Sequence, residues 1–566
     1  MRLLDWAVLI TSLVGIVGYG LYRARGKATM QSYLLAGKTM RWWVIGLSIM
    51  ATQASAITFI GTTGQGFSDG IRFVQFYFGL PIAMVIIAAV AVPFFHNSGV
   101  YTAYEYLERR FDSKTRTVTS IVFLVQRGLG VGLALYAPAV VLSVIMDWPE
   151  WITIIAMGGL VVTYTVIGGI KAVMWTDAQQ MVVMFLGIIA AFFAAIWGLP
   201  SDVSFGDALT LAGNSGKLRA VDLEFDWQNR YNIWSGLIGG TFLALSYFGC
   251  DQSQVQRYLT ARTVADSRIS LLFNGFIKVP LQFVILLTGA LVFTFFVFEQ
   301  PPMLFNTVQR ANMEQAADPA FAAVDSRYRS AFEARREAAR GLIQNESAET
   351  SRAFRAADER MQAARREGIA LVEKRNGGAE YNDTNYIFLN FVISYLPAGL
   401  VGLIIAAVFA AAMSTISAEL NSLATATVVD HYRRYINPKV ADEHHTSVSK
   451  GATAFWGVYA TVFASFGGQL GSLIEAVNIV GSLFYGSVLG VFVLAFAPGR
   501  ANGHGAVGGM LAGLATVFWL HFSAVPVSFL WYNLVGCVVT VVVGLAVSGA
   551  TGGQGRPAKS DTGAPA

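Results

Sequence analysis

The chain has 566 residues, of which 54% are hydrophobic and only 13% are charged. Soluble domains carry about 25% charged residues, so this composition excludes a set of soluble domains and indicates a membrane protein with many spans. The net charge of +5 does not point to nucleic acid, because the basic residues lie in short loops. Cys250 and Cys537 lie in apolar segments and supply neither a disulfide framework nor a zinc motif.

Apolar windows of about 20 residues, the length that spans a bilayer, recur along the chain. The first is not a signal peptide, because no small-residue cleavage site follows it and Arg23 and Arg25 come directly after it. We therefore expect an all-α polytopic membrane protein with about thirteen transmembrane helices. The windows are 4–22, 42–66, 72–95, 116–145, 150–170, 177–198, 231–250, 268–298, 398–425, 451–468, 472–497, 504–522 and 527–548.

Lysine and arginine crowd every second loop between these windows. The basic stretches are 23–41, 109–116, 257–268 and 433–450, together with Lys171. The short loops between them carry no lysine or arginine. The positive-inside rule then predicts a multi-pass protein of the plasma (inner) membrane, with its N-terminus outside and its C-terminus in the cytoplasm.

A hydrophilic insertion at 301–380 separates one part of the transmembrane bundle, 1–300, from the remainder, 381–548. The insertion carries charges of both signs and is rich in Ala, Glu and Arg. We interpret it as an extracytoplasmic helical pair or hairpin that is available for contact with a partner, and a flexible spacer is the alternative. Residues 549–566 have the composition of a disordered cytoplasmic tail.

Residues 405–430 are apolar, yet polar side chains lie in their middle. On a helix, Ser414, Ser417 and Asn421 share one face, with Thr415 beside it. A row of hydroxyls suits a small hard cation that takes oxygen ligands. Close helix packing, with each hydroxyl bonded to a carbonyl one turn earlier, is the alternative.

Two other windows have weak helix formers at their centres. The second, 42–66, contains several threonines and glycines, and the seventh, 231–250, contains four glycines. Discontinuous helices of this kind expose carbonyls and helix ends that bind ions and substrates near the bilayer midplane. Two of them, five spans apart, predict a transporter built from two inverted five-helix repeats, at about 42–198 and from about 231 onward.

Several ionisable side chains fall inside or at the edge of spans. They are Arg127, Asp177, Lys278 and Glu419. A charge within the membrane is a functional hypothesis by default. For Asp177 the alternative is a carboxylate stabilised at a helix N-terminus, and for Lys278 it is a side chain that reaches the cytoplasmic interface.

Five stretches, in this order, resemble the sodium/solute symporter family, whose members include the sodium-coupled sugar, proline, pantothenate, iodide, multivitamin, monocarboxylate and sialic acid carriers. The resemblance implies the leucine-transporter-type fold and symport of Na⁺ with a small organic solute by alternating access. The stretches are TQASAITFIGTTGQGF (52–67), YTAYEYLERRF (101–111), GGIKAVMWTDAQQ (168–180), DQSQVQRYLTAR (251–262) and AAVFAAAMSTISAELNSLATATVVD (406–430).

The resemblance also implies a sodium site. By motif, Ala51, Ala54 and Ala411 would offer backbone carbonyls, and Ser414 and Thr415 would offer hydroxyls. These five oxygens include no carboxylate, which suits a monovalent cation that must be released inside.

Some members of the family bind a second sodium ion with the Asp of the WTD motif and further serines. Asp177, Ser414 and Ser417 match that pattern here, but Ala418 stands where those members have another serine. The resemblance therefore leaves a second sodium ion open.

The resemblance carries over to the solute site less directly. Tyr77 stands where sugar carriers have Glu and Leu80 where they have Ser, which disfavours a hexose. Arg127 lies about one helical turn from the carboxylate-binding Arg of the sialic acid carriers, which favours an anionic or zwitterionic solute. Tyr247 would form an aromatic inner gate, with helix packing as the alternative. The candidate substrate-binding residues are Gln53, Thr58, Phe76, Tyr77, Arg127, Tyr247, Phe248 and Lys278.

No nucleotide-binding loop, metal-hydrolase motif or Ser-His-Asp set occurs in the sequence, so we do not expect an enzyme. Two alternatives to sodium symport stay open. One is proton coupling through Asp177 or Glu419, and the other is a solute sensor that does not transport.

Overall fold

The computed structural model describes residues 1–26, 29–146, 148–378, 380–438, 442–466, 473–497, 501–523 and 525–552. Most of the expected C-terminal tail, from residue 553, lies outside these ranges. Helices make up nearly all the regular structure, and within the described ranges the only β-pairing is an isolated parallel bridge between Met40 and Ala261.

The helices up to the insertion include two 3₁₀ segments, called η1 and η2, and one π-helical segment, called η3. They are α1 (Leu3–Ala24), α2 (Met30–Leu35), η1 (Ala36–Lys38), α3 (Trp42–Gln53), α4 (Ala56–Asp69), η2 (Gly70–Tyr77), α5 (Leu80–Ala89), α6 (Ala91–Ser98), α7 (Ala103–Arg110), α8 (Ser113–Met146), α9 (Glu150–Trp197), α10 (Phe205–Asn214), η3 (Ser235–Gly239), α11 (Gly240–Gly249), α12 (Gln252–Leu259) and α13 (Val264–Phe298).

The insertion and the remainder of the chain follow. Their helices are α14 (Thr307–Gln315), α15 (Pro319–Gln344), α16 (Ala348–Arg375), α17 (Thr384–Tyr395), α18 (Leu400–Ala426), η4 (Thr427–Ile436), α19 (Asp442–Ala464), α20 (Leu473–Phe496), α21 (Gly503–Phe522) and α22 (Phe529–Ala550).

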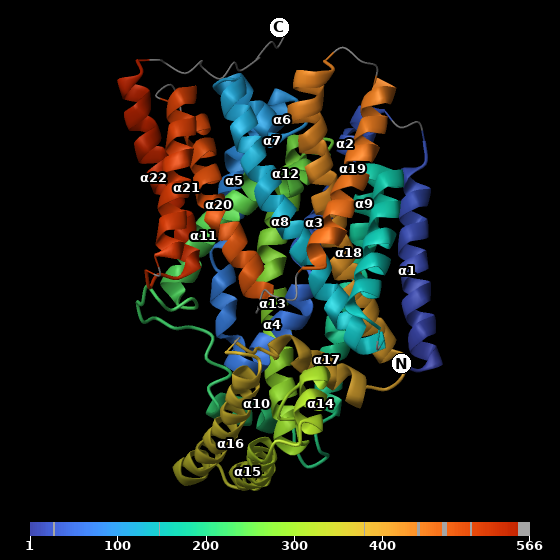
Figure 1. Cartoon of the computed structure of the whole chain (residues 1–566), viewed down its shortest axis with the longest axis vertical. Helices are drawn as coiled ribbons and strands as arrows, with labels where there is room; N and C mark the ends of the chain where they lie inside the picture. The colour runs from blue at the N-terminus through green and yellow to red at the C-terminus, as the bar shows by residue number, and fades with distance from the viewer. Residues whose placement is uncertain are drawn as a thin grey trace.

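Long helices run side by side along one axis and form the bundle (Figure 1). In the described part of the chain, nine helical segments are long and apolar enough to cross a membrane. Two expected spans, 150–170 and 177–198, count as one of these nine, because both lie in α9. α9 changes direction at Gly169, whose φ of 57° and ψ of −160° are not helical. The prediction of about thirteen spans and of an inverted repeat stays a prediction.

Two spans are interrupted inside the bundle, as the weak helix formers in the sequence indicate. α3 ends at Gln53, and α4 begins after Ser55, whose Oγ accepts a hydrogen bond from the Thr58 amide at 3.3 Å. α11 ends at Gly249, and α12 begins after Asp251, whose carboxylate accepts from the Ser253 amide at 2.9 Å. A polar cap satisfies amides that an apolar surrounding would otherwise leave unpaired, so each interruption is stable inside the bundle.

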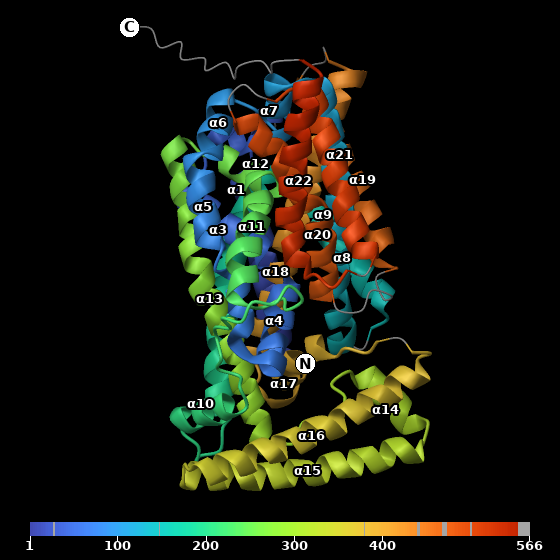
Figure 2. The ribbon, with the colours of Figure 1, turned by 90° about the vertical axis from the view of Figure 1, so that its left-hand side faces the viewer.

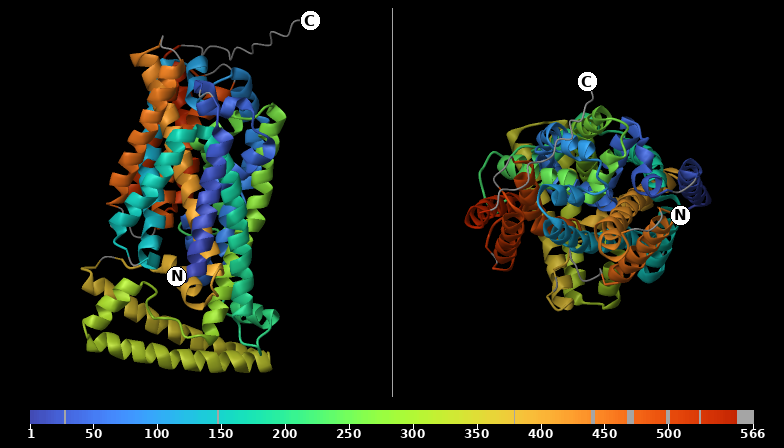
Figure 3. Two further views of the ribbon diagram at one scale, coloured as in Figure 1. Left: turned by 90° about the vertical axis from the view of Figure 1, so that its right-hand side faces the viewer. Right: turned by 90° about the horizontal axis from the view of Figure 1, so that it is seen from above.

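α18 is buried along nearly its whole length and lies at the centre, packed against α9, α8 and α1. α1 and the α21–α22 pair lie on opposite sides of the bundle, as the view from above shows (Figure 3). The N-terminus lies at the same end as the insertion, and α22 ends at the opposite end (Figure 1).

The insertion folds into helices. α15 and α16 lie against each other across one end of the bundle (Figure 2). Arg335 of α15 fastens the pair to α13, because its Nη2 donates to the Phe296 carbonyl at 2.5 Å while its Nη1 lies 3.1 Å from Asp358 Oδ1 of α16. Arg365 of α16 pairs with Asp383, just before α17, at 2.5 Å. The insertion is therefore tied to two helices of the bundle.

Candidate functional site

The end of α3 and the middle of α18 meet inside the bundle with their polar groups facing one another. Ser414 Oγ lies 2.9 Å from the Ala51 carbonyl oxygen and 3.0 Å from that of Ala411. Thr415 Oγ1 lies 3.1 Å from the carbonyl oxygens of both Thr52 and Ala411. The structure thus brings together two segments that are more than 350 residues apart in sequence.

The interruption of α3 explains why these carbonyls are available. The carbonyls of the last helical turn have no partner within their own helix, and α3 ends at Gln53. Ala54 is the residue that leaves the helix, with φ −85° and ψ 67°, and its amide donates to the Met50 carbonyl at 2.8 Å. Ala51 and Ser414 are fully buried. Carbonyl oxygens of this kind, beside hydroxyls whose lone pairs can turn toward an ion, can coordinate a small monovalent cation.

Thr52 was not among the sodium ligands expected from the sequence, although its carbonyl contacts Thr415. The signal was present in the sequence, because a helix that ends near residue 53 frees several consecutive carbonyls.

Asp177, expected at a second sodium site, is engaged elsewhere. Its Oδ2 accepts hydrogen bonds from Ser48 Oγ at 2.6 Å and from Arg257 Nη2 at 2.9 Å. Both members of the ion pair are fully buried. Ser417 Oγ donates to the Ser414 carbonyl at 3.1 Å, so the two serines adjoin, while the carboxylate is bound to α12. Both bonds use Oδ2, while Asp177 Oδ1 is buried without a hydrogen-bond partner among the described residues.

Arg127 lies in a second buried network. Its guanidinium forms ion pairs with Glu419 Oε1 of α18, at 2.7 Å, and with Asp251 at the break before α12. It also donates to the Tyr485 hydroxyl at 2.9 Å. Two carboxylates therefore neutralise this cation without any solute. Its position joins α8, α12, α18 and α20, which suits a residue that holds helices in place.

Lys278, unlike Arg127, is a buried basic residue without a carboxylate partner among the described residues. It is fully buried on α13, and its ammonium has no hydrogen-bond partner among the described residues. Its Nζ lies 5.6 Å from the centre of the Tyr77 ring. Because the side chain ends inside the protein, the alternative that it reaches the cytoplasmic interface is wrong. A buried ammonium without a paired carboxylate is costly, so the site favours an anion or water beside it.

Other polar groups without partners share the face of α13 that carries Lys278. Asn274 and Gln282 lie four residues to either side of it, hence on the same side of the helix, and both are fully buried. Asn274 Oδ1 and both amide atoms of Gln282 lack a partner among the described residues, as does Gln53 Oε1 near the break in α3. Buried polar atoms in native proteins are almost always satisfied, so these atoms indicate a place for water or a polar ligand.

The remaining candidate substrate residues fall into two groups. Phe76 packs against Tyr77, with ring centres 5.0 Å apart, next to Lys278. Tyr247 packs against Phe248 at 4.8 Å and lies under the Arg127 guanidinium at 5.6 Å. Two further candidates, Gln53 and Thr58, lie at either side of the break between α3 and α4.

A model of the sodium:solute symporter family matches residues 33–322 and 365–513, which is most of the chain. The chain belongs to the sodium:solute symporter family. It is therefore a multi-pass membrane carrier that imports a solute with Na⁺ as the coupling ion, as the sequence predicted.

Relatives of this symporter agree over nearly the whole chain. Sodium-coupled monocarboxylate transporter 2 of Mus musculus is 26% identical over 97% of this chain and 84% of its own length. The sodium-dependent multivitamin transporter of Oryctolagus cuniculus is 27% identical over 98% of this chain and 84% of its own. A solved outward-open structure of a Na⁺-coupled sialic acid symporter has a TM-score of 0.76 at 22% identity, covering 98% and 99% of the two chains, and so shares the fold.

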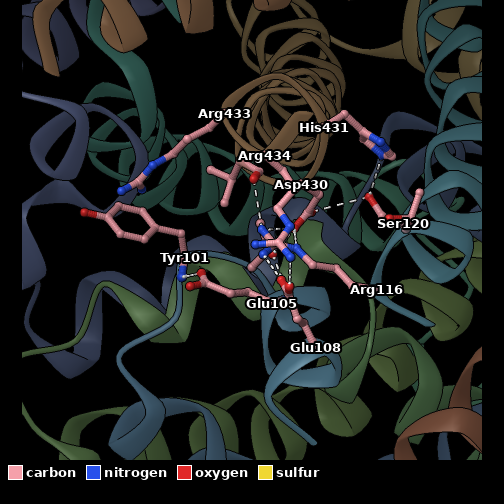
Figure 4. Close-up of polar contacts among 12 residues, drawn as sticks. Tyr101, Glu105, Glu108, Arg116, Ser120, Asp430, His431, Arg433 and Arg434 are labelled. Atoms are coloured by element: carbon pink, nitrogen blue, oxygen red, sulfur yellow. Dashed lines mark hydrogen bonds and ion pairs between the residues drawn. The ribbon is translucent and has the colours of Figure 1, made fainter. Parts of the chain in front are cut away.

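At the end opposite the insertion, the symporter has a third charged network, where α18 continues into η4 (Figure 4). Arg116 of α8 lies 2.8 Å from Asp430 Oδ1 of η4 and 2.7 Å from Glu108 Oε2 of α7. Thr102 Oγ1 also donates to Asp430 at 2.8 Å. Arg434 of η4 pairs with Glu108 as well. These contacts fix the end of the helix that carries Ser414 to α7 and α8.

Sequence reasoning found both segments of the symporter's cation-binding candidate and missed the partners of its buried charges. Arg257 and Asp251 lie within the quoted 251–262 stretch, yet nothing in the sequence assigns them to Asp177 and Arg127. A possible signal was electrostatic, because a buried charge needs an opposite charge nearby.

Proposed function

We propose that this symporter imports a small organic monocarboxylate, with Na⁺ held between the interrupted end of α3 and the middle of α18. The sodium ligands we propose are the carbonyls of Ala51, Ala54 and Ala411 and the hydroxyls of Ser414 and Thr415. The hydrogen bonds of the two hydroxyls across to α3 support this assignment. An arrangement without a carboxylate suits an ion that is released at each cycle, and no covalent chemistry is part of the proposal.

Lys278 is the residue that we propose binds the carboxylate of the solute. It is a buried cation with no partner among the described residues, beside the aromatic pair Phe76 and Tyr77. A carboxylate placed there would form a charge-assisted hydrogen bond and relieve an uncompensated charge. An apolar or aromatic solute body would pack on the two rings. The printed names of the relatives, monocarboxylate and multivitamin transporters, agree with this chemistry.

Arg127 has a different role in this proposal. The sequence favoured it as the carboxylate ligand, but Asp251 and Glu419 already neutralise its charge. We assign Arg127, Tyr247 and Phe248 to an inner gate beneath the solute. Na⁺ and solute would each favour the same outward-open arrangement and so raise one another's affinity.

The finer topology is also part of the proposal. We infer that the insertion and the N-terminus lie outside the plasma membrane, since the basic stretches occupy loops at the opposite end. We also propose thirteen spans from the apolar windows, an inverted repeat from the two interrupted helices, and contact of the hydrophilic insertion with an extracytoplasmic partner. A second sodium ion at Asp177, Ser414 and Ser417 would use Asp177 Oδ1, which has no hydrogen-bond partner among the described residues, while Arg257 stays on Oδ2.

Uptake into proteoliposomes tests the solute proposal. Labelled short monocarboxylates should accumulate with an inward Na⁺ gradient, whereas their amides and neutral hexoses should not. Replacement of Na⁺ by choline at fixed pH should abolish uptake. Uptake that persists in choline would support proton coupling, and solute binding without uptake would support a sensor.

Lys278 supplies the sharper arm of this test. Lys278→Gln should raise the half-saturating concentration of a monocarboxylate by about 10- to 100-fold, because a hydrogen bond to a charged group is worth about 1.5–3 kcal/mol. Lys278→Arg keeps the charge and should retain more affinity. A Lys278→Gln variant with unchanged affinity for carboxylates would contradict the assignment.

A further inference from the structure

A basic cavity lies at the end of the bundle opposite the insertion, outside the solute and ion sites. It has a volume of about 380 Å³ and lies where the C-terminal end of α1, the middle of α2, the bend of α9 and the first half of α19 come together. Its lining includes three cationic side chains from three separate elements: Arg25, Lys171 and Lys450. None of the described lining residues is a carboxylate, so the three charges are not neutralised within the cavity.

The cavity is also half apolar, and this part faces outward. Leu21 and Ala24 of α1 and Ile167 of α9 line it beside the cations. Ile167 is 58% exposed. Farther along α1, Ile10 and Val14 are more than half exposed as well, so the outer side of this helix is an apolar surface facing the lipid chains. The cavity therefore presents cations at one end and continues into a lipid-facing surface.

Hydroxyls and a rigid floor complete the cavity. Ser32 and Tyr33 of α2 line it. The Tyr33 hydroxyl donates to the Val166 carbonyl at 3.1 Å, which ties α2 to the segment just before the bend at Gly169. Lys171 follows that bend by two residues, so its position is set by the turn of α9 and not by a free loop.

We propose that this cavity binds the head group of an anionic phospholipid of the adjacent leaflet. The phosphate would lie among Arg25, Lys171 and Lys450, and an acyl chain would follow Ile167 and the outer side of α1. Basic pockets between transmembrane helices on the cytoplasmic side are suited to anionic head groups. A soluble phosphate would satisfy the cations equally, but it would make no use of the apolar half of the cavity. That this leaflet is the cytoplasmic one depends on the proposed orientation of the chain. The binding of an anionic head group in the cavity does not depend on it.

The test compares two double variants with the same change in charge. Lys171→Gln with Lys450→Gln removes two cations of the cavity. Arg41→Gln with Lys114→Gln is the control, because both residues are exposed and lie in basic stretches of the same end. Purified full-length protein is titrated with phosphatidylglycerol, phosphatidylcholine or inorganic phosphate, and bound lipid is counted by native mass spectrometry alongside the melting temperature.

Phosphatidylglycerol should bind and stabilise the unaltered protein more than phosphatidylcholine does. The cavity variant should lose roughly 25-fold in affinity for it, about fivefold for each lysine removed, while the control keeps its affinity. Equal binding of the two lipids, equal loss in the control, or full replacement by inorganic phosphate would each overturn the proposal. If the double variant does not fold, Lys171→Gln alone must still show the fivefold loss. Sodium-driven uptake in the same preparations reports the transport proposal separately.

Discussion

The hydroxyls of Ser414 and Thr415 allow a direct test of the proposed cation site. Ser414→Ala removes an oxygen that lies 2.9 Å from the Ala51 carbonyl, while the rest of α18 keeps its packing. Thr415→Val removes the second hydroxyl and keeps the volume of the side chain. If each hydroxyl is one of about five ligands, its loss should weaken Na⁺ binding substantially without unfolding the protein.

The expected size follows from the charge of the ion. A contact with a charged group is worth about 1.5–3 kcal/mol, so each variant should raise the half-saturating Na⁺ concentration by about 10- to 100-fold. By contrast, a neutral hydrogen bond contributes only about 0.5–1.5 kcal/mol to stability. The variants should therefore remain folded, with a much larger change in sodium dependence than in melting temperature.

The assay is solute uptake into proteoliposomes as a function of external Na⁺ at fixed solute concentration. Ser422→Ala is the matched control, because this buried hydroxyl donates within its own helix, to the Glu419 carbonyl at 2.8 Å. Thr415→Ser retains the hydroxyl and should keep the sodium dependence of the natural protein. The assignment fails if Ser414→Ala and Thr415→Val leave the sodium curve where Ser422→Ala leaves it.

Three further changes probe the buried charges and the bend of α9. Arg127→Gln should lower the maximal rate of monocarboxylate uptake and the melting temperature together, because two buried carboxylates lose their shared partner. Asp430→Asn should lower the stability by about 1.5–3 kcal/mol, measured by thermal unfolding, since Arg116 and Thr102 lose an ionised acceptor while Glu108 still pairs with Arg116. Gly169→Ala should also lower the melting temperature, because a left-handed φ costs about 1–2 kcal/mol and the new Cβ would lie 2.6 Å from the Tyr33 ring.

Each of these expectations has an outcome that contradicts it. An Arg127→Gln variant that keeps its maximal uptake rate and melting temperature, but has a raised half-saturating monocarboxylate concentration, would return this residue to the solute site. An unchanged melting temperature in Asp430→Asn would mean that the network at the end of α18 is not needed for stability. Gly168→Ala is no suitable control for Gly169→Ala, since its Cβ would also clash, whereas Gly159→Ala meets no neighbour within 4 Å and should be tolerated.

The sequence predicted the parts of the fold that depend on local chemistry. Threonines and glycines in 42–66 correctly indicated an interrupted helix, and the position of the break at Ala54 follows from Ser55 acting as a cap. The family motif correctly indicated that residues near Ala51 and Ser414 meet. The insertion is helical because its Ala, Glu and Arg favour helix wherever packing does not decide.

The pairing of buried charges could not be predicted in the same way. Asp177 and Arg257 are 80 residues apart, and several carboxylates could have served either cation. Only the three-dimensional structure, which places Asp177 of α9 beside Arg257 of α12 and packs α8 against α18, selects the partners. The same packing leaves Lys278 without a hydrogen-bond partner among the described residues, which a list of charged residues inside the spans cannot reveal.

The hydrogen bonds between α3 and α18 have a consequence for the carrier when no Na⁺ is bound. Without a bound ion, carbonyl dipoles gathered at one point would repel one another and push the two helices apart. Here Ser414 and Thr415 already supply a proton to that point, so each hydroxyl stands in for positive charge when no cation is there. If these hydroxyls are the proposed sodium ligands, we expect each to rotate from donor to ligand when the ion binds, so that α3 and α18 stay connected with or without Na⁺.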